Sequence, residues 1–148
     1  MQPITLNVFV SSTWLDLQPE REAVQVALHR LRELKFVGME YFGSREDAPR
    51  EASAGEVDRC QLYIGIFGGR YGSGITEAEY RQARERGKPC LIYCQAETVI
   101  KPQWKEADTN NASRLAGLKE ELRREHIVSE FSTPEDLAAR LTADLHRW

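Results

Sequence analysis

Hydrophobic residues along the chain alternate between short unbroken runs and longer stretches where they recur every three or four positions. The runs predict strands at residues 5–10, 36–41, 62–67, 90–94 and 126–131. The periodic or capped stretches predict helices at about 19–34, 50–59, 76–86, 112–124 and 134–148. Five strands alternating with five helices predict parallel βαβ units in a three-layer α/β sandwich, with the flavodoxin-like strand order 2-1-3-4-5.

Individual residues support these boundaries. The run from Leu62 to Phe67 is apolar throughout, as is typical of a central parallel strand covered on both faces. Thr76 and Thr133 are each placed to cap the start of a helix, and Pro134 follows the second of them at the first helical position. The polar stretch 97–111 lies between the fourth strand and the next helix, and we expect it to be a mobile or lid-like loop.

Length and charge narrow the class of protein. A chain of 148 residues is one domain, and its net charge of −3 argues against a nucleic-acid partner. We expect no membrane segment and no signal peptide, because no window is long and apolar enough and the first residues enter a strand at once. The three cysteines, Cys60, Cys90 and Cys94, lie near no histidine ligands, so we expect cytoplasmic packing thiols and no metal site.

The predicted topology places a ligand site at the carboxyl ends of the first and third strands, where the strand order reverses. The residues at those ends, together with one at the end of the second strand, are Ser11, Ser12, Thr13, Glu40, Gly68, Gly69, Arg70 and Tyr71. The hydroxyl groups either cap the turn into the first helix or bind ribose or phosphate. The glycine loop either satisfies unusual backbone angles or exposes N–H groups to an anion, with Arg70 as a solvated charge or a phosphate partner. No Gly-Lys-Ser/Thr follows the glycines, so a P-loop is not indicated.

Two acids in the helix after the glycine loop are the catalytic candidates. Glu77 lies in the first turn, where it complements the helix dipole. Glu79 is our first choice and Glu77 our second, because Glu79 together with Ala83 defines one helix face. If that face turns to the crevice, the Glu79 carboxylate can act as a nucleophile or stabilise an oxocarbenium ion. A further cluster, Glu20 with Arg21 beside Asp16, is interpreted as an internal ion pair that anchors the loop.

The chain resembles a family of N-terminal domains of uncharacterised function that precede STAND/NACHT-type NTPases, tetratricopeptide arrays and WD40 arrays. The motifs that carry the resemblance are VFVSST at 8–13, DL at 16–17, ER at 20–21, MEYF at 39–42, DRCQLYIGIFGGRYG at 58–72, TEAEY at 76–80 and GKP at 87–89. The resemblance covers residues 7–94 and returns weakly at the last helix. It implies that residues 1–148 form the N-terminal module of a longer protein.

That family looks TIR-like and is also similar to nucleoside 2-deoxyribosyltransferase-like domains. In catalytic relatives, a glutamate on the helix after the third strand serves chemistry at an N-glycosidic bond, and this position matches Glu79. The resemblance therefore implies a signalling or defence adaptor that self-associates and contacts its downstream domains. The alternatives are an enzyme that processes NAD or a related nucleotide as substrate, without a resident cofactor, and a domain that only packs on its neighbours. The full catalytic pattern of neither relative is present, and fold analogy alone does not carry function.

Overall fold

The computed structural model describes residues 5–35, 38–43 and 50–147. Within these residues five strands form one sheet, namely β1 (Thr5–Ser11), β2 (Gly38–Gly43), β3 (Leu62–Phe67), β4 (Cys90–Gln95) and β5 (Ser129–Phe131). The strand order is β2-β1-β3-β4-β5, and each neighbouring pair is parallel. The predicted α/β class with a parallel sheet is confirmed.

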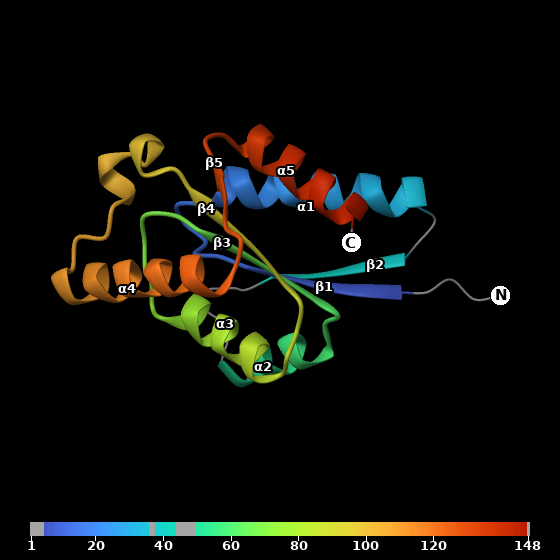
Figure 1. Ribbon diagram of the computed structural model, residues 1–148, viewed down its shortest axis with the longest axis horizontal. Coiled ribbons are helices and arrows are strands. Elements are labelled where there is room, and N and C mark those ends of the chain that lie inside the picture. The colour runs from blue at the N-terminus through green and yellow to red at the C-terminus, as the bar shows by residue number, and fades with distance from the viewer. Residues whose placement is uncertain (1–4, 36–37, 44–49, 148) are drawn as a thin grey trace.

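The helices cover both faces of this sheet (Figure 1). They are α1 (Gln18–Lys35), α2 (Arg50–Arg59), α3 (Ile75–Glu85), α4 (Thr109–Glu125) and α5 (Pro134–Arg147). Helices α1 and α5 lie side by side on one face, whereas α2, α3 and α4 lie on the other. The fold thus has three layers, as the alternation of strands and helices predicts.

Strand β1 shows how the sequence builds the two cores. Side chains alternate across a strand, so Val8 and Val10 pack against α1 and α5 while Phe9 packs against the other helix layer. Phe9 stacks on Tyr63 of β3 at a ring-centroid distance of 6.2 Å. Every residue of β3 is buried, because both of its faces are covered.

Some boundaries differ from the sequence prediction. Strand β5 is shorter than predicted and β2 ends two residues later, while α4 begins three residues earlier. The N-cap of α3 is Gly74 instead of Thr76, which lies buried inside the first turn. Gly74 has a φ of 92°, a conformation that a glycine adopts without steric cost, so the glycine sets the helix start.

The polar stretch after β4 is a folded connection. It contains two short 3₁₀ turns, η1 (Glu97–Val99) and η2 (Pro102–Trp104), and we call residues 96–108 the covering segment. One end is held by Lys119 of α4, whose buried ammonium lies 2.7 Å from a Glu97 carboxylate oxygen. Among the described residues, no helix is long and apolar enough to cross a membrane.

Candidate functional site

The carboxyl ends of β1 and β3 bring the leading candidate residues together. Ser11 ends β1, and its hydroxyl donates a 2.8 Å hydrogen bond to Oε1 of Glu79 on α3. Both side chains are buried, with Glu79 only 2% exposed. The helix face that carries Glu79 therefore does turn toward β1, but the Glu79 carboxylate is buried there against Ser11.

The hydroxyl groups that follow β1 bond mostly to neighbouring protein groups. Ser12 accepts a 2.7 Å hydrogen bond from Nη1 of Arg21 and donates one to the Thr13 carbonyl oxygen. Thr13 donates to Oδ1 of Asp16 at 2.5 Å. Arg21 thus anchors the loop after β1 through Ser12, whereas the ion pair between Glu20 and Arg21 stays a prediction.

The glycine loop after β3 is covered. A Cβ on Gly69 would overlap the Trp104 backbone and lie 2.7 Å from Cγ2 of Ile100, so only glycine fits beneath the covering segment. The Gly69 carbonyl oxygen accepts a 2.8 Å hydrogen bond from the Glu106 N–H. A Cβ on Gly68 would lie only 3.1 Å from Oδ2 of Asp16, which shows that the two segments pack closely.

A chain of polar contacts continues from the covering segment onto the helices. Oε2 of Glu106 accepts a 2.9 Å hydrogen bond from the Tyr71 N–H. The Tyr71 hydroxyl donates to Oε1 of Glu77 at 2.8 Å. Arg81 then bridges Glu77 on its own helix and Glu121 on α4. Glu77 is therefore an ion-paired structural residue in this arrangement.

Arg70 lies near the same cluster, with its Nη1 3.9 Å from Oδ1 of Asp16. Beside it a hollow lined by Thr13, Tyr71, Thr76 and Glu77 has a volume of about 10 Å³. Such a volume holds roughly one water molecule. A ribose or phosphate group does not fit there without movement of the loops.

Burial also shifts the pKa of Tyr63, which lies next to Ser11 and Glu79. Burial raises the pKa of Tyr63 well above its ordinary value, the nearby Ser11 hydroxyl opposes this shift, and the Glu79 charge adds to it. Tyr63 comes from the middle of an apolar run, and Glu106 from a polar loop. Sequence reasoning missed both, because neither residue has a local pattern that marks it as a neighbour of this edge.

One residue predicted for the candidate site, Glu40, does not lie at the carboxyl edge of the sheet. The sequence pattern predicts Glu40 at the end of the second strand, but β2 continues to Gly43, and Glu40 pairs in register with Asn7 near the start of β1. Three residues at about 3.3 Å each separate Glu40 from the carboxyl end of its strand. The error arose because the sequence pattern misplaced the strand.

The described histidines, cysteines and acids form no group of three or more arranged to hold a metal ion. Burial raises the pKa of the Cys90 thiol to about 11. Burial likewise raises the pKa of Cys60 and of Cys94. All three thiols are free, and each packs in or against the core on the α2–α4 side, as predicted.

The parallel sheet, its strand order and the cluster at its carboxyl edge define a flavodoxin-like α/β domain. A family model described as a domain of unknown function, DUF4062, matches residues 7–146. The chain belongs to that family. Among curated proteins, none matches the sequence.

Solved structures with similar folds span nearly the whole chain. One is a crystal structure of the RPS4 and RRS1 TIR domain heterodimer, with a TM-score of 0.59 and 8% identity over 97% of this chain and 96% of that one. Another is an NADPH-quinone reductase from P. pentosaceus, with a TM-score of 0.50 and 9% identity over 97% of this chain and 96% of that one. At such identities the likeness shows the fold alone, which is TIR-like and flavodoxin-like.

Proposed function

We propose that this chain is a cytoplasmic signalling or defence module that acts by self-association. In this proposal it belongs to a longer STAND-type protein and transmits a signal from downstream domains. The TIR-like fold supports a role of this class, and the comparison structure of that fold is a heterodimer of two TIR domains. Function in an association module depends on its surface and does not require an open crevice.

The closure of the sheet edge is the observation that carries this proposal. Hydrogen bonds join Glu79 to Ser11, Thr13 to Asp16, and the Glu106 carboxylate to the Tyr71 N–H. Hydrogen bonds of this kind between protein groups stabilise the folded domain. Among the described residues, the hollow beside Arg70 suits a water molecule.

Sedimentation velocity with the 148-residue chain tests the proposal. We expect the weight-average sedimentation coefficient to rise as the concentration increases from micromolar to millimolar. Light scattering coupled to gel filtration gives the mass of the species formed. A strict monomer across this range contradicts self-association by this domain.

One observation favours a second candidate, cleavage of NAD or a related nucleotide at its N-glycosidic bond. The Ser11 hydroxyl and the Glu79 carboxylate meet at the edge where ligands bind in open α/β sheets. In hydrolysis, the oxygen of water would bond to the anomeric carbon of the ribose while the C–N bond to the base breaks. The base leaves with the electron pair of that bond, and the proton lost from the water passes to the solvent. Glu79 would stabilise the positive charge that develops on the ribose, and the covering segment must first move away.

Chromatography of NAD incubated with concentrated protein tests this second candidate. Activity appears as released nicotinamide, and the matched variant is Glu79→Gln, which can still accept the Ser11 hydrogen bond and so stay folded. Turnover by the wild type that is lost in Glu79→Gln supports the enzyme. Absence of turnover in monomeric and associated protein, with no thermal shift on adding NAD, eliminates it.

A further inference from the structure

The covering segment, residues 96–108, connects β4 to α4 beyond the carboxyl ends of the strands (Figure 1). Near its end, Glu106 makes two hydrogen bonds with the glycine loop. The Glu106 N–H donates to the Gly69 carbonyl oxygen at 2.8 Å, and the Glu106 carboxylate accepts from the Tyr71 N–H at 2.9 Å. One residue of the segment thus binds the loop through both its backbone and its side chain.

The Glu106 carboxylate places a negative charge where the loop offers a donor and a cation. The donor is the Tyr71 N–H. The cation is Arg70, whose side chain is 25% exposed and lines the same hollow as Tyr71. Backbone N–H groups and guanidinium groups bind phosphate oxygens as readily as carboxylate oxygens. The carboxylate therefore holds a position that also suits an anionic group from outside the chain.

The covering segment is held more loosely than the core beneath it. Its two 3₁₀ turns contain three residues each, and most of its side chains are exposed, whereas Ala96 and Ile100 are buried. Segments with short turns and little buried apolar surface open locally at a lower free energy than core strands do. Part of the segment is therefore able to lift away while the sheet stays folded.

The end of the segment next to β4 is anchored more firmly. Lys119 of α4 is buried, with its side chain 7% exposed, and its ammonium lies 2.7 Å from a Glu97 carboxylate oxygen. Separating the two would leave a buried charge without its partner, which is strongly unfavourable. The Glu97 end is thus the anchor, and the Glu106 end is the one that opens.

We propose that the covering segment is an autoinhibitory strap, in which the Glu106 carboxylate occupies the place that a phosphate group of a ligand takes at the glycine loop. The phosphate binds the Tyr71 N–H and Arg70, displaces Glu106, and the strap swings about the Glu97 anchor. A phosphate carries more charge and more acceptor oxygens than a carboxylate, so it engages the N–H and the guanidinium together. This inference goes beyond self-association and requires no turnover, because it concerns binding alone.

Titration with inorganic pyrophosphate tests the competition. By isothermal titration calorimetry, we expect Glu106→Ala to bind pyrophosphate at least tenfold more tightly than the wild type, because every molecule is then competent to bind. The matched control is Glu85→Ala, which removes an exposed acid from the last residue of α3 and should bind like the wild type. Arg70→Gln in the Glu106→Ala background should reverse the gain. Circular dichroism melts check folding, and Glu106→Gln replaces Glu106→Ala if the latter does not fold.

Amide hydrogen exchange measured by NMR shows whether the strap itself is displaced. When pyrophosphate saturates the wild type, the Glu106 N–H should exchange at least tenfold faster, because its hydrogen bond to Gly69 is broken. The Tyr71 N–H should stay protected, because the phosphate replaces the carboxylate as its acceptor. A contact with only a structural role gives no such opposite response of the two N–H groups.

The outcomes separate this strap from the proposed function. If Glu106→Ala speeds exchange in residues 96–108 but binds pyrophosphate no more tightly than Glu85→Ala does, the contact is structural and the inference is wrong. Binding that leaves the exchange of the Glu106 and Tyr71 N–H groups unchanged places the anion elsewhere and also overturns it. A wild type that stays monomeric contradicts self-association and leaves the strap standing, so the two proposals fail separately.

Discussion

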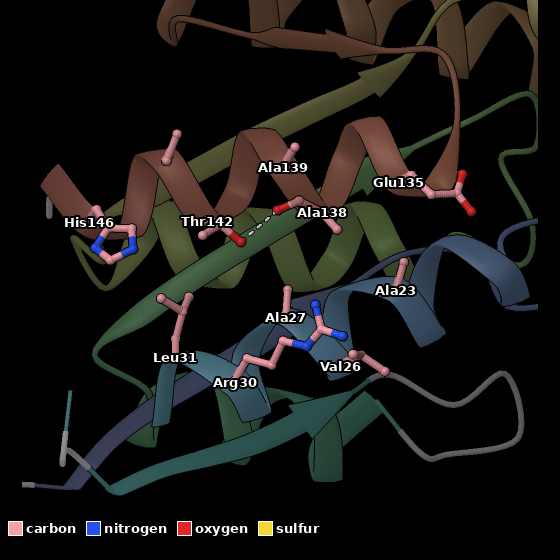
Figure 2. Close-up of a pocket in the computed structure, with 11 residues that line it drawn as sticks. Ala23, Val26, Ala27, Arg30, Leu31, Glu135, Ala138, Ala139, Thr142 and His146 are labelled. Carbon is pink, nitrogen blue, oxygen red and sulfur yellow. Dashed lines mark hydrogen bonds between the residues drawn. The ribbon is translucent and has the colours of Figure 1, made fainter. Parts of the chain in front are cut away.

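The carboxyl edge of the sheet holds the polar candidate residues but is closed, whereas the α1–α5 face is open but carries few polar groups. At the edge, carboxylates and hydroxyl groups lie close enough for chemistry, yet they are buried and bonded to one another. On the α1–α5 face a large groove is open and its lining is mostly apolar, with the Arg30 guanidinium beside Ala27 near its middle (Figure 2). The comparison teaches that a cluster of reactive residue types can be part of the core, while an accessible groove can be lined mainly by apolar side chains.

The largest expected effect is the difference in stability between substitutions on the buried and on the exposed side of α5. Leu141 is fully buried beneath the groove, and Leu141→Ala should lower the free energy of unfolding by about 2–5 kcal/mol because it leaves a cavity. Ala143→Arg on the exposed side of the same helix should change it by no more than about 0.5 kcal/mol. Urea unfolding followed by circular dichroism measures both. A large loss in Ala143→Arg would show that the groove wall belongs to the core.

Closure of the edge is tested by adding a methyl group beneath the covering segment. Gly69→Ala should lower the free energy of unfolding by about 1–3 kcal/mol, because the new Cβ overlaps the Trp104 backbone. It should also speed amide hydrogen exchange in residues 96–108. The matched control is Gly117→Ala on α4, where a Cβ meets nothing within 4 Å and should add up to about 1 kcal/mol of stability. Equal behaviour of the two variants would mean that the segment does not close the edge.

The smallest effect is expected at Glu20, which lies between the two regions near Asp16 and Glu135. Burial raises the pKa of Glu20, its own backbone N–H opposes the shift, and the charges of Asp16 and Glu135 add to it. An acid with a raised pKa binds more protons in the folded state, so its contribution to stability is complete below its ordinary pKa and is lost as the pH rises through the folded value.

Glu20→Gln removes that titration. We expect a higher thermal midpoint than the wild type at neutral pH, by less than the changes above, and a difference that shrinks as the pH falls toward 4.5, the ordinary value for glutamate. Differential scanning calorimetry across this pH range measures the change. A variant that is less stable at neutral pH would show that the Glu20 charge stabilises the N-terminus of α1.

The positions of the helices and strands along the chain could be predicted from the sequence to a large extent. The apolar run of β3 and the cap of α5 appear where the pattern placed them, and the Asp136 N–H does donate to the Thr133 hydroxyl oxygen. These features depend on residues within a few positions of one another. Strand β2 and the start of α3 were misplaced because a weak apolar run and adjacent capping candidates leave the boundary open by several residues.

Assembly of the candidate site was decided only by the tertiary structure. The sequence limited Glu79 to one helix face and Ser11 to one strand end, but these residues are separated by 68 positions when their side chains meet. The contact between Glu106 and Tyr71 and the groove between α1 and α5 likewise join segments with no local relation. Hydrophobic periodicity restricts the type of each element and the face that it buries. Contacts between side chains that are distant in the sequence depend instead on how the helices and the sheet pack against one another.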